Sequence, residues 1–418
     1  MDTPWFSRFF ERVGIALIKI SQDDFLALVL PKCKQIITQS ELEHLLSSGR
    51  RLKIKLGIDA TGAQLHLGHA VPLMLLRLFQ RRGHEIHFII GDFTGQIGDP
   101  SGRGDKRAQL SSKEIQKNIK TYTKQIAPFI DLKKAKVHKN SKWLSRMSLS
   151  EYLRIAGAIN FSAVAQRDDF RERSKTDAGV TLREAAYASL MAIDSVQLKT
   201  DIEIGGIDQL LNMMQAREVM EAEGLASEVV LTTPLIEGTA GDGRKMSKSF
   251  NNFIALESSA EDQFGLVMSI PDSLILSYYI SFADVYEHEI SELKRFIEQH
   301  PLDAKKELAM LIVALMHSKK DSQKARADFE RKFSKQEYTK SDEKQIFTKF
   351  PVLVFDALTD AFEATHSKSS IRILIKQGGV RRLDGEDGQK ILTSLDDEIK
   401  PGDLIKVGKM NLFRFVQK

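Results

Sequence analysis

Apolar residues occupy every second position from Leu52 to Ile58, which is the period of a strand. After a loop at 59–65, apolar positions follow helical spacing from about Gly68 to Arg82, and Glu85–Ile90 is a second strand-like run. Strand, loop, helix and strand in this order predict a βαβ unit. We therefore expect an α/β fold with a Rossmann-like parallel sheet that carries helices on both faces.

The pattern on either side extends this sheet and adds further regions. Residues 1–50, which include Ile36 and Ile37, have helical spacing and predict an N-terminal helical segment. The sheet domain is expected at 51–256. Its remaining elements are predicted as helices at 112–126, 152–159, 181–198 and 208–223 and as strands near 137, at 202–204 and at 229–231.

Beyond residue 256 the composition changes twice. Residues 257–340 are rich in Lys, Glu, Gln and Ala at helical spacing, which predicts a helical domain. Residues 350–418 alternate apolar patches with Gly-rich turns and predict a small α+β module. Its β-rich patches are expected at Ile371, Ile373 and Ile375, at 404–407 and at 413–416. From Thr365 to Lys418, eleven Lys/Arg stand against seven Asp/Glu, a surplus that suits a polyanionic partner.

Two loops follow predicted strands, at Asp59–His69 and at Gly91–Arg103. In parallel sheets, ligands bind beyond the carboxyl ends of the strands, where both loops lie. Gly91–Arg103 holds four glycines, too many for a helix or strand interior. The loop is either a plain surface turn or backbone placed against a ligand, and its position after a buried strand favours the ligand.

Two short motifs supply candidate chemistry: His66-Leu67-Gly68-His69, and later Lys245-Met246-Ser247-Lys248-Ser249. Two imidazoles at the start of a helix can reach phosphate groups, and the helix dipole there already favours anions. Lysines of a second loop can then close on a triphosphate. Taken alone, either motif could be ordinary polar surface. Their conjunction indicates an enzyme that activates a carboxylate with ATP.

Composition narrows the class of protein. The 418 residues imply two or three domains, and 42% hydrophobic with 28% charged residues is typical of a globular chain. No apolar run approaches the roughly 20 residues of a membrane span, and a secretory signal is not expected. The single cysteine, Cys33, leaves no disulfide or cysteine-based zinc site and favours the cytoplasm. The net charge of +5 permits a polyanionic partner without requiring one.

The glycine-rich block, the two motifs, the Gly205–Gln209 turn and the tail together resemble bacterial tyrosyl-tRNA synthetases, a family of class I aminoacyl-tRNA synthetases. The resemblance extends from about residue 30 to the end, and Ser370–Val380 is similar to an S4-type RNA-binding module. It implies ATP-dependent activation of tyrosine and transfer to tRNA, with Mg²⁺ carried by ATP, no tightly bound cofactor and no protein metal site. It also implies a homodimer with no membrane partner, a helical anticodon-binding domain at 257–340 and an S4-like domain at 350–418.

The resemblance assigns roles by position. Catalytic roles fall on His66, His69, Lys245, Lys248 and Thr61. ATP binding falls on Asp59, Gly68, Gly206, Asp208 and Ser249. Amino-acid binding falls on Lys55, Gly57, Asp99, Tyr187, Met191, Asp194 and Gln209. RNA binding falls on Arg372, Lys376, Arg381 and Arg382.

The chain departs from the family pattern mainly near the amino acid. Met191 stands where glutamine is usual, Ile207 replaces a small polar residue, Ala60 replaces proline, and Ala192-Ile193 precede Asp194 in place of a Gly-Tyr-like pair. A thioether accepts hydrogen bonds only weakly, so Met191 cannot replace an amide as a partner of the substrate ammonium. These departures leave an alternative open: a paralogue that activates a tyrosine analogue or confers resistance to a tyrosyl-adenylate mimic.

Two hypotheses from other classes are weaker. A non-catalytic RNA-binding protein with the same fold would have no need of the intact histidines and lysines. A nicotinamide-binding enzyme would need a Gly-x-Gly-x-x-Gly turn after the first strand, and the chain has none there.

Overall fold

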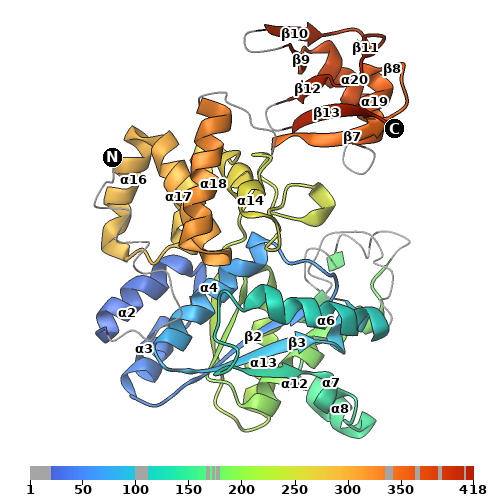
Figure 1. Ribbon diagram of the computed structural model, residues 1–418. Helices are drawn as coiled ribbons and strands as arrows, with labels where there is room; N and C mark the ends of the chain where they lie inside the picture. The colour runs from blue at the N-terminus through green and yellow to red at the C-terminus, as the bar shows by residue number, and fades with distance from the viewer. Residues whose placement is uncertain are drawn as a thin grey trace. The chain divides into compact units, whose positions relative to one another are not determined.

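The computed structural model describes residues 20–98, 112–165, 170–171, 175, 179–334, 342–362, 368–384, 388–408 and 411–418 (Figure 1). The chain forms two compact units, 1–326 and 327–418. The predicted parallel sheet and most of the predicted helical domain belong to the first unit, and the predicted tail module belongs to the second. The finer boundaries at 50, 256 and 340 stay a prediction.

A six-stranded sheet forms the centre of the first unit, in the order β1-β6-β5-β2-β3-β4. The strands are β1 Gln35–Ile37, β2 Lys53–Asp59, β3 Glu85–Gly91, β4 Lys136–Lys139, β5 Ile202–Gly206 and β6 Val229–Thr233. All neighbours pair in parallel except β1, which is antiparallel to β6. The predicted βαβ unit and parallel sheet are confirmed.

Residues 20–50, the described part of the predicted N-terminal helical segment, are less helical than predicted. Helices α2 Gln22–Val29 and α3 Gln39–Ser47 are present, but Ile36 and Ile37 lie in the edge strand β1 and not in a helix. The Lys34 N–H donates to the Thr232 carbonyl at 2.6 Å, which brings the chain onto the sheet edge. Branched isoleucines suit such a strand, and three residues are too few for a periodicity to reveal.

Helices pack on the sheet through alternate positions of its strands. Lys55 of β2 reaches Ser195 in α12 Tyr187–Leu198, so its neighbours in the strand point to the other face. There α4 Leu67–Arg81 packs across β2, β3, β5 and β6. Helix α13 Leu210–Ala222 packs on β5 and β6 and also against α12.

Strands β2 and β5 pair over only two positions, Ile54 with Ile202 and Lys55 with Glu203. By contrast, β2 pairs with β3 along its whole length from Lys53 to Asp59. The chain also leaves the sheet in opposite directions from these two strands, since β3 lies beside β2 and β6 beside β5. The carboxyl ends of β2 and β5 therefore part at a topological switch point, where parallel sheets bind ligands.

Two local predictions need correction. The glycine-rich loop, predicted to be too rich in glycine for a helix, contains the short helix α5 Thr94–Ile97, which includes Gly95 and ends at Gly98. The single helix predicted at 181–198 is two helices, α11 Leu182–Ala185 and α12, which meet at Ala186. Helix α6 Ser112–Ile126 matches its prediction. Short helices α7 Ser141–Leu144, α8 Leu149–Ala156 and α9 Phe161–Ala165 lie between α6 and α11.

The region after residue 256 is helical, as predicted. It contains α14 Ala260–Met268, α15 Ile275–Phe282, α16 Ile290–Gln299, α17 Pro301–Met316 and α18 Lys319–Phe329. Helix α17 packs against α14, α15 and α16. No single helix in the described part of the chain is long and apolar enough to cross a membrane, although α14 and the sharply bent segment that follows it reach that length and hydropathy together.

The second unit is an α+β module, as predicted. Its five-stranded sheet has the order β10-β9-β12-β13-β7. The strands are β7 Lys344–Thr348, β9 Val380–Asp384, β10 Gly388–Leu392, β12 Leu404–Val407 and β13 Asn411–Gln417. A separate pair is formed by β8 Val352–Leu353 and β11 Glu398–Ile399, and the helices are α19 Val354–Ala361 and α20 Lys368–Lys376.

The prediction of a β-rich patch at Ile371, Ile373 and Ile375 is wrong, because these residues lie in α20. Ile371 and Ile375 are one helical turn apart and both are buried in the core of the module, whereas Ile373 is 55% exposed. Three alternating isoleucines match a strand in sequence. In a strand all three side chains would lie on one face, so the exposure of Ile373 between two buried isoleucines identifies the helix.

We predict that Ile375→Ala destabilises the second unit by about 2–5 kcal/mol, because it leaves a cavity in the core. Ile373→Ala on the same helix is the matched control and should change stability by no more than about 0.5 kcal/mol. Amide hydrogen exchange of β9 and β12 in the full chain measures both. Equal effects of the two substitutions would contradict the helical assignment.

Candidate active site

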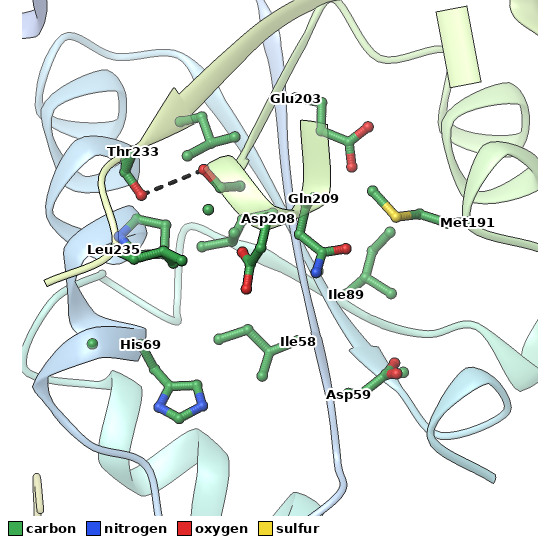
Figure 2. A pocket seen from close by; sticks show the side chains of 18 of the residues that line it. Ile58, Asp59, His69, Ile89, Met191, Glu203, Asp208, Gln209, Thr233 and Leu235 are labelled. Carbon is green, nitrogen blue, oxygen red and sulfur yellow. Dashed lines mark hydrogen bonds between the residues drawn. The ribbon is translucent and has the colours of Figure 1, made fainter. Parts of the chain in front are cut away.

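A cavity of about 320 Å³ opens where β2 and β5 part. Its walls come from the ends of β2 and β5, the start of α4, helix α12 and the segment after β6 (Figure 2). Most residues predicted for catalysis and substrate binding line it: Lys55, Gly57, Asp59, Thr61, His66, Gly68, His69, Tyr187, Met191, Asp194, Gly206, Asp208, Gln209 and Lys245.

His66 and His69 form the amino-terminal cap of α4. The Gly68 N–H donates to His66 Nδ1 and the His66 N–H donates to His69 Nδ1, each at 3.2 Å. Because both Nδ1 atoms accept, the proton of each neutral ring is inferred to lie on Nε2. Burial, with Lys248 and Lys245 nearby, lowers the pKa of His66 to about 2 and that of His69 to about 4. Both rings are therefore neutral donors at a helix terminus that favours anions.

Gly68 is required by this cap. A Cβ at this position would lie 3.0 Å from the imidazole of His66 and 3.8 Å from the Cβ of Met246. Met246 is buried. The loop Lys245–Ser249, which we call the lysine loop, therefore packs directly on the first turn of α4. The glycine thus lets the two predicted motifs meet.

The lysine loop reaches the cavity from the side opposite the histidines. Lys245 Nζ lies 3.0 Å from Asp208 Oδ2, at the turn after β5. Lys248 is exposed and does not line the cavity, and its Nζ is 3.0 Å from where a Cβ on Gly62 would be. Ser249 is exposed and does not line the cavity, and its N–H donates to Ser247 Oγ at 3.3 Å. The four side chains of the two motifs converge.

The other end of the cavity is a connected polar network. The hydroxyl of Thr94 donates to Asp59 Oδ1 at 2.6 Å, and that of Tyr187 donates to Asp59 Oδ2 at 3.0 Å. Asn140 Nδ2 donates to Thr94 Oγ1 and to Asp194 Oδ2, at 3.0 and 3.3 Å. Asp59, which the sequence predicted to face ATP, is thus fixed by donors from α5 and α12.

Gly91 makes room for this network, because a Cβ there would lie 2.0 Å from Asp59 Oδ1.

Asp194 is buried at the closed end of this network. Trp143 Nε1 donates to its Oδ1 at 2.7 Å. Burial raises the pKa of Asp194 to about 6, although Lys55 and the bonds from Trp143 and Asn140 oppose the rise. The sequence reasoning missed Asn140 and Trp143, which sit beyond the motifs at the start of α7.

Lys55 lies among three buried carboxyl groups. Its Nζ is 2.8 Å from Glu203 Oε1 and also bonds Ser195 Oγ, which in turn donates to Glu228 at 2.9 Å. Burial opposes the charge of Lys55, but Glu203, Glu228 and Asp194 together raise its pKa. Burial and the neighbouring Glu228 raise the pKa of Glu203 well above its usual value. The sequence analysis missed Glu203, although a glutamate between Ile202 and Ile204 in an apolar strand is a signal of a paired charge.

The departures from the family pattern fall in different environments. Met191 lines the cavity on the α12 side, across from Gln209, whereas Ile207 is not among the described residues that line it. Ala192 and Ile193 are fully buried in a hydrophobic cluster beneath α12. The Ala60 N–H donates to the Gly91 carbonyl at 3.2 Å, a bond that proline could not make. Asp99 lies outside the described residues.

The four residues predicted to bind RNA lie in the second unit, and they differ in how far their side chains are exposed to a binding partner. Arg372 and Lys376 are exposed on α20, with the Arg372 guanidinium 4.8 Å above the ring of Phe355. Arg381 is exposed on β9. Arg382 is largely buried and pairs with Asp403 at 2.9 Å. Arg382 therefore has an evident structural role. Among the described residues, no group of three or more His, Cys, Asp or Glu could hold a metal ion.

Comparison with known proteins agrees with this geometry. The profile of the family described as tRNA synthetases class I (W and Y) matches residues 47–334. The tyrosine–tRNA ligase of Thermotoga maritima is 36% identical over 91% of this chain and 94% of its own length. Tyrosine–tRNA ligase 2 of Photorhabdus laumondii is 38% identical over 90% and 94%.

Solved structures share the fold. The Aspergillus nidulans mitochondrial tyrosyl-tRNA synthetase, truncated at its C-terminus, has a TM-score of 0.63 at 21% identity and covers 79% of this chain and 98% of its own. The Archaeoglobus fulgidus tyrosyl-tRNA synthetase complexed with L-tyrosine has a TM-score of 0.59 at 24% identity and covers 72% and 98%.

We predict that the stability difference between Asp194→Asn and the wild type changes with pH. The folded pKa of Asp194 is raised, so the acid stabilises the folded wild type while protonated and loses this contribution as pH rises through about 6. From pH 5 to pH 7 the variant should gain about 1 kcal/mol relative to the wild type. Urea unfolding followed by Trp143 fluorescence measures this difference. A difference that stays constant would contradict the assignment.

Proposed function

The chain belongs to the tyrosine–tRNA ligases of the class I tRNA synthetases, and on this premise we propose how its cavity performs the reaction. The carboxylate of tyrosine attacks the α-phosphate of ATP, a P–O bond forms, and pyrophosphate leaves with the electron pair of the broken bond. A hydroxyl of the terminal ribose of tRNA then attacks the carbonyl carbon of the adenylate and AMP leaves. The observation that carries this proposal is that His66, His69 and Lys245 line the same cavity, with Lys248 close enough for its charge to lower the pKa of both imidazoles.

The nucleotide half of the site lies between α4 and the lysine loop. The Nε2–H groups of His66 and His69 donate to phosphate oxygens, and Lys245 and Lys248 meet the charge that develops on the pyrophosphate. Donors that are already fixed by the cap of α4 need little reorganisation when that charge appears. Mg²⁺ would enter the site bound to ATP and would supply further positive charge to the phosphate oxygens.

The remaining predicted residues complete this half. Thr61 and the ribose-side residues Gly206 and Asp208 line the cavity between the two motifs. A Cβ on Gly206 would lie 2.6 Å from Asp208 Oδ1, so glycine at this position leaves room for the carboxylate.

The tyrosine half of the site lies against α12. Tyr187 faces the substrate ammonium, and we assign Asp59 to the same contact, and no longer to ATP, because the Tyr187 hydroxyl donates to it. Asp194 receives the phenol hydroxyl, and Gln209 lies near the carboxylate that reacts. A substrate without the hydroxyl would leave the buried Asp194 short of a partner, which costs binding energy. Met191 adds apolar surface where the ammonium needs a hydrogen-bond acceptor. Tyr187 and Asp59 therefore supply the oxygen atoms that accept from the ammonium.

The second unit and the helical region supply the contacts to tRNA. We assign phosphate contacts to Arg372, Lys376 and Arg381, which are exposed, and not to Arg382. The single cysteine agrees with a cytoplasmic location.

We propose that the chain is a homodimer through α8, α9 and α11. Leu149 and Leu153 of α8 are 72% and 59% exposed and lie one helical turn apart. Phe161 of α9 and Leu182 of α11 are 63% and 84% exposed, and these two helices pack together. Exposed apolar side chains of this size, on three neighbouring described helices of the chain, support an interface there.

We predict that Lys248→Ala lowers kcat for tyrosine-dependent ATP–pyrophosphate exchange by about 10²-fold, because one cation is lost from the leaving group. KM for tyrosine should be unchanged, since Lys248 is remote from that half. Arg244→Ala in the same loop, where Arg244 pairs with Asp242, is the control and should retain nearly full activity. Exchange supported better by another amino acid than by L-tyrosine would contradict the substrate assignment, and full activity of Lys248→Ala would contradict the role of the loop.

We predict that Leu153→Glu combined with Leu182→Glu yields a monomer, because two charges cannot be buried at an apolar interface. Leu302→Glu on α17, where Leu302 is 58% exposed, is the control and should remain a dimer. Light scattering during size-exclusion chromatography measures the mass. A wild type that runs as a monomer would contradict the dimer.

A further inference from the structure

The loop between β2 and α4, residues 60–65, carries Thr61 and leads directly into His66. It contains neither helix nor strand, so its backbone N–H and C=O groups have no regular ladder of their own. Ala60 and Leu65 at its two ends are fully buried, where water cannot serve as a partner. The loop therefore depends on another element for its hydrogen bonds.

Helix α6 supplies these bonds from one of its faces. Four of its polar side chains follow the spacing i, i+3, i+4, i+7, which places them on the same side of the helix. They are Asn118, Thr121, Tyr122 and Gln125. Polar side chains that face inward need partners as well. Each of the four bonds a backbone group in the range 59–65, so the helix and the loop satisfy each other.

Gln125 makes two of these bonds, at the end of the loop that precedes the histidine motif. Its Oε1 accepts from the Leu65 N–H at 2.6 Å, and its Nε2 donates to the Ala63 carbonyl at 2.9 Å. A donor on one side and an acceptor on the other define which way the amide points. Gln125 is 3% exposed and is not among the described residues that line the catalytic cavity. It thus holds the backbone without reaching the substrates.

The other bonds of α6 extend this support along the loop. Asn118 Nδ2 donates to the Ala60 carbonyl at 2.9 Å. The Thr121 hydroxyl donates to the Ala63 carbonyl at 2.8 Å, so this carbonyl has a second donor from the same helix. The loop is therefore fixed near its start, in its middle and at its end by a single element.

The residues on either side of His66 are also fixed by the segment that follows the lysine loop. The Leu256 N–H donates to the Leu65 carbonyl, and the Leu67 N–H donates to the Ile254 carbonyl, each at 3.0 Å. The N–H of Leu65 is thus held by a side chain of α6 and its carbonyl by backbone. Because His66 Nδ1 is occupied within the cap of α4, the position of its Nε2–H follows from the position of this backbone.

We propose that Gln125 is a positioning residue for adenylation: it holds the backbone of Ala63 and Leu65 and so places the Nε2–H of His66 against the phosphate oxygens. This role rests on the proposed function, in which His66 donates to a phosphate. A donor that is fixed before charge develops needs little reorganisation. Its displacement by about 1 Å can cost about 10²-fold in rate.

Tyrosine-dependent ATP–pyrophosphate exchange by Gln125→Met tests this role, because methionine keeps the length of the side chain and loses both bonds. The kcat should fall about tenfold or more, because the imidazole is no longer fixed. The KM for tyrosine should stay within about twofold, since Gln125 does not line the described cavity.

Gln116→Met is the matched control on the same helix. Gln116 lies on the opposite, exposed face of α6, where its Oε1 accepts from Lys139 Nζ at 2.9 Å. The same substitution there should leave both kcat and KM unchanged.

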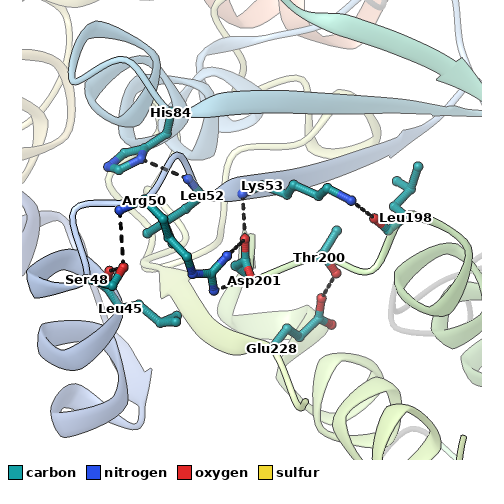
Figure 3. Close-up of polar contacts among 10 residues, drawn as sticks. All are labelled: Leu45, Ser48, Arg50, Leu52, Lys53, His84, Leu198, Thr200, Asp201 and Glu228. Carbon is teal, nitrogen blue, oxygen red and sulfur yellow. Dashed lines mark hydrogen bonds and ion pairs between the residues drawn. The ribbon is translucent and has the colours of Figure 1, made fainter. Parts of the chain in front are cut away.

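A second control separates positioning from loss of stability. Asp201 pairs with Arg50 at 2.6 and 3.0 Å and accepts from the Lys53 N–H at 2.8 Å (Figure 3). These bonds lie at the start of β2, whereas the loop follows its end. Asp201→Ala should therefore lower the unfolding temperature and leave kcat unchanged. Thermal unfolding of each variant measures the stability, and only Gln125→Met should combine a loss of stability with a lower kcat.

A double-mutant cycle shows whether Gln125 acts through the histidine. His66→Ala alone should lower kcat about 10²-fold, because a donor to the phosphate is lost. In that background Gln125→Met should change kcat by less than about twofold, since the group that it positions is gone. Full activity of His66→Ala would contradict the proposed function, and the role of Gln125 with it.

The proposal alone is overturned if His66→Ala lowers kcat as expected but Gln125→Met lowers it equally in both backgrounds. It is also overturned if Gln125→Met has the kcat of the wild type. Thr121→Val, which removes the other donor to the Ala63 carbonyl, takes its place if Gln125→Met does not fold. Its kcat should fall about threefold with an unchanged KM for tyrosine, and a wild-type kcat would overturn the proposal in the same way.

Discussion

The ion pair between Lys55 and Glu203 marks the last position at which β2 and β5 are joined. Beyond it the two strands part and the substrate cavity opens between them. Burying a charged pair in a sheet interior is costly. The hydrogen bonds from Lys55 to Ser195 and from Ser195 to Glu228 offset part of that cost and extend the pair into a buried network. The pair therefore closes the floor of the cavity and ties the sheet to α12, which carries Tyr187, Met191 and Asp194.

Charge is distributed along the cavity according to what each end must bind. At the nucleotide end the imidazoles are neutral, and the full positive charges belong to the lysine loop. At the tyrosine end the carboxylates dominate, and each is held by donors from a different element. The charges of the site thus attract the triphosphate of ATP to one end of the cavity and the ammonium group of tyrosine to the other, before either substrate makes a specific contact.

Much of this arrangement could be predicted from the sequence. The period-two and helical patterns predicted the parallel sheet, and the two motifs identified His66, His69 and Lys245, which line one cavity. Contacts between elements were harder to foresee. Asn140 and Trp143 act on Asp194 from a short helix with no motif, and the Lys55–Glu203 pair depends on a register that sequence periodicity does not define.

The errors have a common physical cause. Ile36 and Ile37 were assigned to a helix and Ile371–Ile375 to a strand, and each segment is too short for its period to decide the structure. Pairing with β6 decides the conformation of the first segment, and burial of Ile371 and Ile375 decides that of the second. The secondary structure at Ile36, Ile37, Ile371 and Ile375 can be assigned only when the elements that contact them are known.

The contact of Lys245 with Asp208 has a consequence for which molecules can enter the nucleotide half of the site. The ammonium group of Lys245 already pairs with the carboxylate of Asp208, so an incoming compound must offer the ammonium a more strongly charged partner. A triphosphate does so, whereas adenosine brings no negative charge with which to compete. Discrimination against nucleosides therefore begins with an exchange of partners at one lysine, before the base or the ribose is recognised.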